Sequence, residues 1–229
     1  MWEKLLGLLI SETVVLVTLR LLLGIARKDR EMTDDNLRFT CCIGVMCLLF
    51  GEMVFFSVSH YNVSEVWVKL GMYIVMGMLA GCLLMACITD YRICMVHCYV
   101  WWVAGVAGVI LLAFSCKSFF SNPISVEQII KMFCSKFSPL LIFGLLQEKL
   151  FGRMYGKADC HAFLVCAMAE CAVGMGIEGY LIHMLLSVLA LAVVQGIKGN
   201  IGNKGNLKKP VPFLPYITGA FWTLMLIAA

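Results

Sequence analysis

Residues 67–89 read WVKLGMYIVMGMLAGCLLMACIT, and Lys69 is the only charged residue among them. An α-helix needs about 20 apolar residues to cross the hydrocarbon core of a bilayer, and this run meets that length. The whole chain is 62% hydrophobic and only 14% charged, whereas a soluble domain is typically about half apolar. These features predict an all-α protein, a polytopic transmembrane helical bundle.

Seven further stretches are similarly apolar. We expect about eight spans, at residues 5–26, 39–59, 67–89, 99–116, 137–151, 160–177, 180–196 and 213–229. The fifth is short for a span, and the segment before it, 117–136, is too polar to cross a membrane. The first has a long core that contains Glu12 and Arg20, so we expect a retained span rather than a cleaved signal peptide. The sequence thus predicts a single integral-membrane domain over residues 1–229.

The basic residues are distributed unevenly over the loops between these spans. If the loop after the first span is cytoplasmic, twelve Lys and Arg residues lie inside and five lie outside. Cytoplasmic loops carry the excess of basic residues in membrane proteins, so the asymmetry predicts that both termini are outside. The same topology puts Asp90 and Asp159 together on the cytoplasmic face. The basic residues form no single stripe, so we expect no nucleic-acid partner.

Twelve cysteines raise the question of metal sites and disulfides. They include no C-x-x-C pair, and most lie inside apolar runs, where cysteine behaves as a small hydrophobic residue. His97 stands beside Cys94 and Cys98, but neither spacing is a standard zinc arrangement. We therefore expect no metal and no cofactor.

Asp90 and Asp159 are two of only five aspartates, and each lies at the edge of an apolar run. Asp159 opens a helix, where a carboxylate caps free N–H groups and meets the positive end of the helix dipole. Asp90 ends a helix, where the dipole disfavours an anion, so it needs another explanation. Two interpretations stay open: ordinary boundary charges, or a dyad that shares one proton. In a dyad the ionised carboxylate activates a water, and the protonated one polarises the scissile carbonyl.

Three motifs follow one another along the chain. Residues 90–98 read DYRICMVHC, residues 156–159 read GKAD, and residues 211–220 read VPFLPYITGA. They resemble the D-x-x-x-x-x-[IV]-P-N, G-x-G-D and I-P-F-G-P-[FY]-L-x-x-G-A patterns of the type IV prepilin leader peptidase family. His97, Cys98 and Ala158 depart from the family, which has Pro, Asn and Gly at the corresponding positions.

The resemblance implies a membrane aspartic endopeptidase of a prokaryotic plasma membrane. Such an enzyme cleaves short basic leader peptides from type IV pilin-like precursors at the cytoplasmic face. The catalytic roles would belong to Asp90 and Asp159. The loop at residues 27–38 has no cysteine, so it lacks the paired C-x-x-C insert of full-length bacterial members, and we expect no zinc and no N-methyltransferase activity. The candidate substrate-positioning residues are Gly156, Lys157, His161 and Arg92.

Two other functions stay open from the sequence. The altered residues after Asp90 suit a catalytically inactive relative that binds pilin-like precursors without cutting them. A small membrane transporter would use Glu12, Glu52 and Glu170 to line a pathway, although the hydropathy shows no duplicated halves. Glu170 lies eleven residues past Asp159, on nearly the same helical face and about 16 Å further along the helix. We expect it to face the bundle interior in a hydrogen-bonded packing role.

Overall fold

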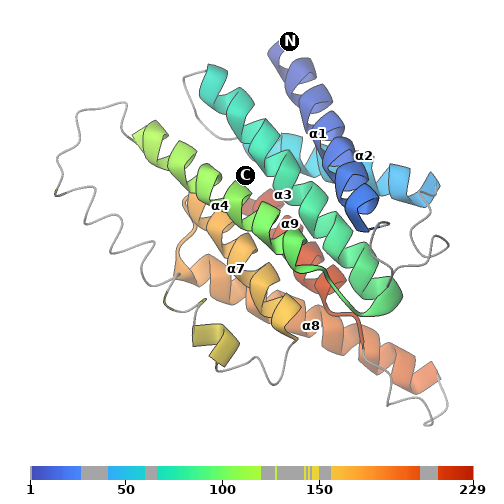
Figure 1. Ribbon diagram of the computed structural model, residues 1–229. Coiled ribbons are helices and arrows are strands. Elements are labelled where there is room, and N and C mark those ends of the chain that lie inside the picture. Colours follow the sequence, from blue (N-terminus) through green and yellow to red (C-terminus); the bar gives the residue numbers. More distant parts are fainter. Residues whose placement is uncertain are drawn as a thin grey trace.

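The structure is a computed structural model that describes residues 2–26, 41–59, 66–119, 127, 142, 144, 146–149, 156–201 and 211–228. All the regular secondary structure formed by these residues is helical, which confirms the all-α prediction. The long helices pack side by side into one bundle (Figure 1). They are α1 (Trp2–Ala26), α2 (Cys41–Ser59), α3 (Val66–Ile93), α4 (Cys98–Phe119), α7 (Lys157–Ala172), α8 (Ile177–Ile201) and α9 (Leu214–Ala228).

Four of these helices, α1, α2, α3 and α8, are long and apolar enough to cross a membrane. The apolar parts of α4 and α9 are shorter. The structure therefore supports a membrane protein, and the number of spans stays a prediction. The predicted fifth helix, 137–151, falls mostly outside the described residues. Those that the structure describes within it, 142, 144 and 146–149, are helical.

The predicted helix at 160–177 is wrong at its C-terminal end. The observed helix α7 has 16 residues and stops at Ala172, a length of about 24 Å against roughly 30 Å of hydrocarbon core. Gly174 follows in the left-handed region, with φ +87°. Its N–H donates to the carbonyl of Cys171 at 3.0 Å, and the N–H of Met175 donates to that of Glu170 at 2.9 Å. This pair of bonds is a Schellman motif, which ends α7 and lets α8 begin at residue 177.

Helix α3 is the most buried of the four long apolar helices and packs against α1, α2, α4 and α9. It approaches α1 closely where two glycines, four residues apart, face that helix. A Cβ atom on Gly77 would lie 3.1 Å from Val14, and one on Gly81 would lie 2.8 Å from Thr18. Small residues at this spacing let membrane helices pack tightly. The pairing also shows that α1 and α3 run parallel.

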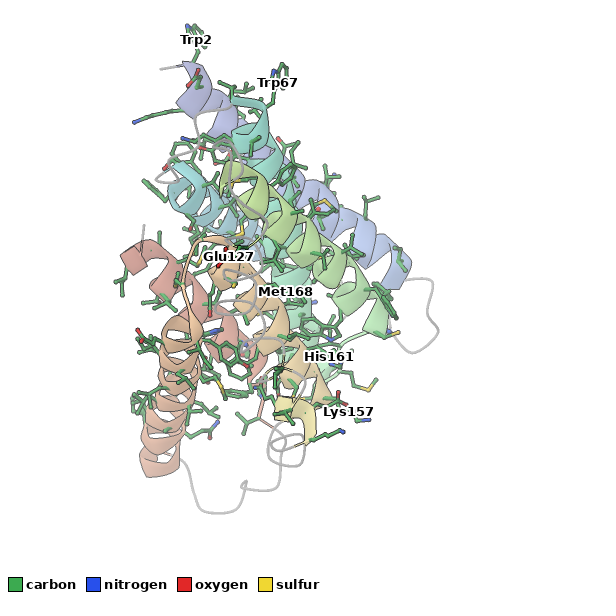
Figure 2. The ribbon with its side chains drawn as sticks, turned by 90° about the vertical axis from the view of Figure 1, so that its left-hand side faces the viewer. Trp2, Trp67, Glu127, Lys157, His161 and Met168 are labelled. Carbon is green, nitrogen blue, oxygen red and sulfur yellow. The ribbon has the colours of Figure 1, made fainter. Side chains whose placement is uncertain are left out.

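The two ends of the bundle differ in the residues that they present. Figure 2 shows Trp2 and Trp67 at one end and Lys157 and His161 toward the other. Both tryptophans are exposed, as is typical of aromatic residues at a membrane–water interface. At the opposite end, α1 and α3 finish and α4, α7 and α9 begin, so this end collects the motifs that the sequence singled out.

Candidate functional site

Asp90 lies in the last turn of α3, which continues to Ile93 instead of ending at residue 89 as predicted. The N–H of Cys94, a residue with φ +53°, donates to the Asp90 carbonyl at 2.9 Å and closes the helix. The Asp90 side chain points to the start of α9. Its Oδ2 accepts a hydrogen bond from the Leu214 N–H at 3.1 Å, and the backbone of Phe213 bonds to the same carboxylate.

The start of α9 explains why an anion is found at the end of α3. The first N–H groups of a helix have no partner within that helix, and they carry the positive end of its dipole. Pro215, the second residue of α9, has no N–H. The Asp90 carboxylate therefore caps α9 from another helix. Burial raises the pKa of the Asp90 carboxyl group, and the backbone donors of Leu214 and Phe213 oppose part of this rise.

Asp159 is the third residue of α7, and it caps its own helix. Its Oδ2 accepts a hydrogen bond from the Gly156 N–H at 2.9 Å, which confirms the predicted capping role. Burial raises the pKa of Asp159 to about 6; the bond from Gly156 opposes this rise, and the charge of Asp90 adds to it. The last contribution means that the fold brings the two carboxylates within electrostatic reach of each other.

Two phenylalanines join the halves of the site. Phe163 follows Asp159 by about one turn of α7, and its ring meets that of Phe213 edge to face, with centroids 6.1 Å apart. Phe213 directly precedes Leu214, whose N–H binds Asp90. The contact therefore packs the backbone that binds one aspartate against the helix that carries the other.

Gly156 lies close to the Asp159 carboxylate, a contact that the sequence did not predict. Its φ of −63° is available to any residue. A Cβ atom at this position would lie 3.3 Å from Oδ2 of Asp159, so the glycine makes room for the carboxylate. Its predicted role in substrate approach stays a prediction.

The charged candidates lie apart from the carboxylate of Asp159. Lys157 and His161 are exposed and share a face of α7 that points away from Asp159, because residues two apart do not face the same side of a helix. Nδ1–H of His161 donates to the Lys157 carbonyl at 2.6 Å, and the His161 ring stacks on Trp101 with centroids 6.2 Å apart. Arg92 is also exposed, in the last turn of α3. All three residues lie at the end of the bundle that carries the aspartates.

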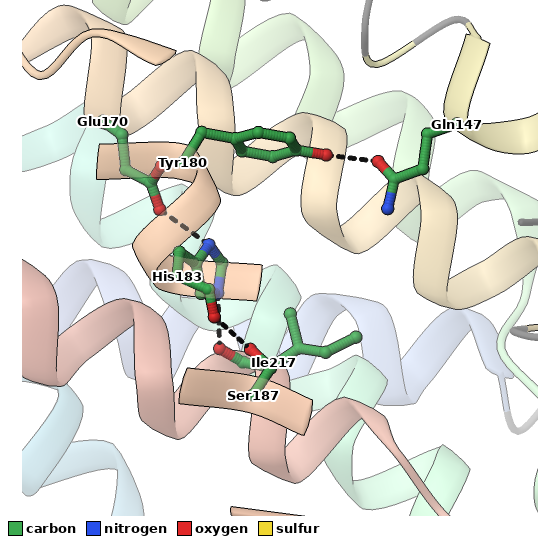
Figure 3. Close-up of polar contacts among 6 residues, drawn as sticks. All are labelled: Gln147, Glu170, Tyr180, His183, Ser187 and Ile217. Carbon is green, nitrogen blue, oxygen red and sulfur yellow. Dashed lines mark hydrogen bonds and ion pairs between the residues drawn. The ribbon is translucent and has the colours of Figure 1, made fainter. Parts of the chain in front are cut away.

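Glu170 is fully buried, and it contacts a residue that the sequence did not single out. Its Oε1 lies 2.7 Å from Nδ1 of His183 in α8, and both side chains are 0% exposed. Nε2–H of His183 donates to the carbonyl of Ile217 in α9 at 2.9 Å (Figure 3). The predicted interior position of Glu170 is confirmed. A buried carboxylate in an apolar helix needs a polar partner, and the lone histidine in the apolar sequence of α8 was the available signal.

The chemistry of the site rests on two carboxylates and the backbone donors around them. Among the residues that the structure describes, no group of three or more His, Cys, Asp and Glu side chains is placed to hold a metal ion. Comparisons of the chain with protein-family models, with curated proteins and with solved structures found no match.

Proposed function

We propose that this protein is a membrane aspartic endopeptidase that cleaves short basic leaders from type IV pilin-like precursors. The observation that carries the proposal is that both aspartate-bearing helices meet the start of α9: Asp90 binds the Leu214 N–H, and Phe163 of α7 packs on Phe213. The resemblance of three motifs to the leader peptidases supports it. Those motifs lie far apart in the sequence, yet Asp90, Asp159 and the start of α9 meet at one place.

The hydrogen bonds and the burial of the two carboxylates suggest which one acts as the base and which one as the acid. The backbone N–H groups at the start of α9 bond to the Asp90 carboxylate and favour its ionised form, so we assign Asp90 the role of base. Asp159 receives one backbone bond, and burial raises its pKa to about 6, so we assign it the proton of the pair below that pH. A pair of this kind provides a base and an acid at the same site.

Peptide hydrolysis then follows from one water molecule and one shared proton. Asp90 takes a proton from the water as its oxygen bonds to the scissile carbonyl carbon, and Asp159 gives its proton to the carbonyl oxygen. The tetrahedral intermediate collapses when the C–N bond breaks. The proton on Asp90 passes to the leaving amine, and a hydroxyl proton of the intermediate returns to Asp159. The dyad ends in its starting state.

Water reaches the dyad without a deep channel, because both carboxylates lie at the end of the bundle. Tyr91 and Met95 beside Asp90 are exposed, as is Lys157 beside Asp159. A pilin-like precursor is an apolar helix that follows a short basic segment. Its helix would lie in the bilayer while the junction with the leader reaches this end of the protein.

For the topology, we propose eight spans, both termini outside, and the Asp90 end in the cytoplasm of a prokaryotic cell. The excess of basic residues in the corresponding loops supports this orientation. Cys94 and Cys98 are exposed beside Asp90, so they report its side of the membrane. A membrane-impermeant maleimide should label them in inverted vesicles and not in intact cells, and Cys94→Ser/Cys98→Ser should remove that labelling. Labelling of these two residues in intact cells would reverse the topology.

The activity is tested with purified protein and a pilin-like precursor. The wild type should cut once, between the leader and the apolar helix. Asp90→Asn and Asp159→Asn should each abolish cleavage while the protein still inserts into the membrane. Glu178→Gln is the matched control, since Glu178 is an exposed carboxylate in the first turn of α8. Cleavage retained in either aspartate variant would refute the dyad.

A catalytically inactive relative that binds precursors is the second function that an observation favours. Asp90 caps α9, a structural role that needs no chemistry, and His97 and Cys98 replace the family's Pro and Asn. Such a protein would bind the precursor without cutting it, and both asparagine variants would bind it as the wild type does. A transporter has less support, because Glu52 is exposed and Glu170 is engaged with His183.

A further inference from the structure

The buried contact between Glu170 and His183 has no part in the proposed cleavage steps. It connects the helix that carries Asp159 to the helix that Asp90 caps. We propose that this contact is a positioning device, which holds the start of α9 against α7 and so sets the distance between the two carboxylates. The catalytic consequence rests on the proposed function, whereas the mechanical link does not.

The link crosses three helices through consecutive polar contacts. Glu170 belongs to α7, eleven residues after Asp159, and its Oε1 lies 2.7 Å from Nδ1 of His183 in α8. Nε2–H of His183 donates to the Ile217 carbonyl of α9 at 2.9 Å. Figure 3 shows the imidazole between the Glu170 carboxyl group and the Ile217 backbone. Ile217 is three residues past Leu214, so the link reaches the turn of α9 that donates to Asp90.

The hydrogen-bond chemistry makes this link specific. Nε2 must carry a hydrogen, because a carbonyl oxygen only accepts. Nδ1 faces the Glu170 carboxyl group at 2.7 Å, within the distance of an ion pair. Both side chains are 0% exposed, so bulk water does not replace a lost partner, and removing one side chain leaves the other unsatisfied.

Aromatic packing holds the imidazole in a fixed place between α7 and α9. The His183 ring has its centroid 5.2 Å from that of Phe163 in α7 and 6.0 Å from that of Phe221 in α9. Phe163 also meets Phe213 at the start of α9. Helix α8 packs mainly on α9 and contacts α7 more sparsely. A polar bond across the α7–α8 boundary therefore restrains a part of the bundle where apolar contact is limited.

Two substitutions test the link, and two more serve as controls. Glu170→Asp shortens the side chain by one C–C bond, about 1.5 Å, and His183→Leu removes the imidazole. Glu170→Gln keeps a group that can donate to Nδ1. Ser187→Ala removes another buried hydroxyl of α8, which donates to the His183 carbonyl at 2.8 Å within its own helix.

We expect a change in kcat without a change in precursor binding. A displacement of about 1 Å at a catalytic group can cost on the order of 100-fold in rate, so kcat should fall about 10- to 100-fold in Glu170→Asp and His183→Leu. KM should stay within about twofold in both, because both side chains are 0% exposed and so out of reach of a bound precursor. Glu170→Gln should restore kcat to within about threefold of wild type, and Ser187→Ala should leave it unchanged. The double variant Glu170→Asp/His183→Leu should be no slower than His183→Leu alone, since both break one link.

Hydrogen exchange of the peptide covering residues 211–218 tests the link without activity. Exchange should speed up in Glu170→Asp and His183→Leu and stay at the wild-type rate in Ser187→Ala. Unchanged hydrogen exchange together with unchanged kcat in Glu170→Asp would overturn the inference. If His183→Leu does not fold, Glu170→Asp alone tests whether the contact holds the start of α9. If Asp90→Asn or Asp159→Asn still cleaves precursor, the proposed function fails, and the exchange measurement still decides whether the link holds α9.

Discussion

Replacing Asp90 by asparagine separates the two roles that the structure gives to this side chain. Asparagine keeps an oxygen that accepts from the Leu214 N–H, whose bond to Asp90 is 3.1 Å long, but it cannot take a proton from water. The cap loses only its charge, which contributes about 0.3–1 kcal/mol at a helix N-terminus. The loss of a general base lowers a rate by about 10²- to 10⁴-fold. Stability should therefore change little while cleavage nearly disappears.

Comparing Asp90→Asn with Asp90→Ala separates the loss of the base from the loss of the helix cap. Alanine removes the acceptor as well as the base, and the loss of a capping side chain costs about 0.5–2 kcal/mol. Both variants should cleave equally slowly in a gel assay of precursor processing. Only the alanine variant should show a clear fall in thermal unfolding temperature in detergent.

The opposite pattern would show that Asp90 is a cap and nothing more. In that case asparagine would resemble wild type in both assays, and alanine would lose stability and activity together. A rate for Asp90→Asn above about a tenth of wild type would refute the assignment of Asp90 as the base, since it falls short of the smallest expected effect.

Three further changes test other parts of the structure. The pKa of Asp159 is about 6. We therefore expect kcat/KM to fall as pH rises through that value, because the dyad loses its proton. A flat profile of kcat/KM between about pH 5 and pH 8 would contradict the assignment of that proton to Asp159. Gly156→Ala places a Cβ atom 3.3 Å from the Asp159 carboxylate. Because this displaces the carboxylate, kcat should fall roughly 3- to 10-fold, while the protein still inserts into the membrane normally. An unchanged kcat would show that the site tolerates the methyl group. Gly174→Ala should lower the free energy of unfolding by about 1–2 kcal/mol, because φ is +87° there. Gly176→Ala is the control for this variant, since it has open space and no such φ, and equal denaturation midpoints would rule out the strain.

The local features of the chain followed from the sequence because they depend on neighbouring residues alone. Apolar runs of about 20 residues predict membrane helices, since backbone groups in hydrocarbon must bond within the helix. The cap formed by Asp159 involves a residue only three positions away. The interior position of Glu170 follows from the 3.6-residue period of its helix. The early end of α7 was also a local event, and the left-handed Gly174 was the residue that signalled it.

The tertiary structure decided which of these local features meet. Asp90 binds Leu214, which lies 124 residues further along the chain. The apolar periodicity of either helix does not predict this contact. Its place depends on how whole helices pack, through contacts such as Phe163 against Phe213 and through the polar link from Glu170 to α9 by way of His183. The sequence of a helix determines which of its faces is apolar. The surface shape of the neighbouring helices determines which helix packs on that face and at what position along the axis. For this reason Asp90 looked misplaced at the end of its own helix, and only the assembled bundle supplies the N–H groups that it binds.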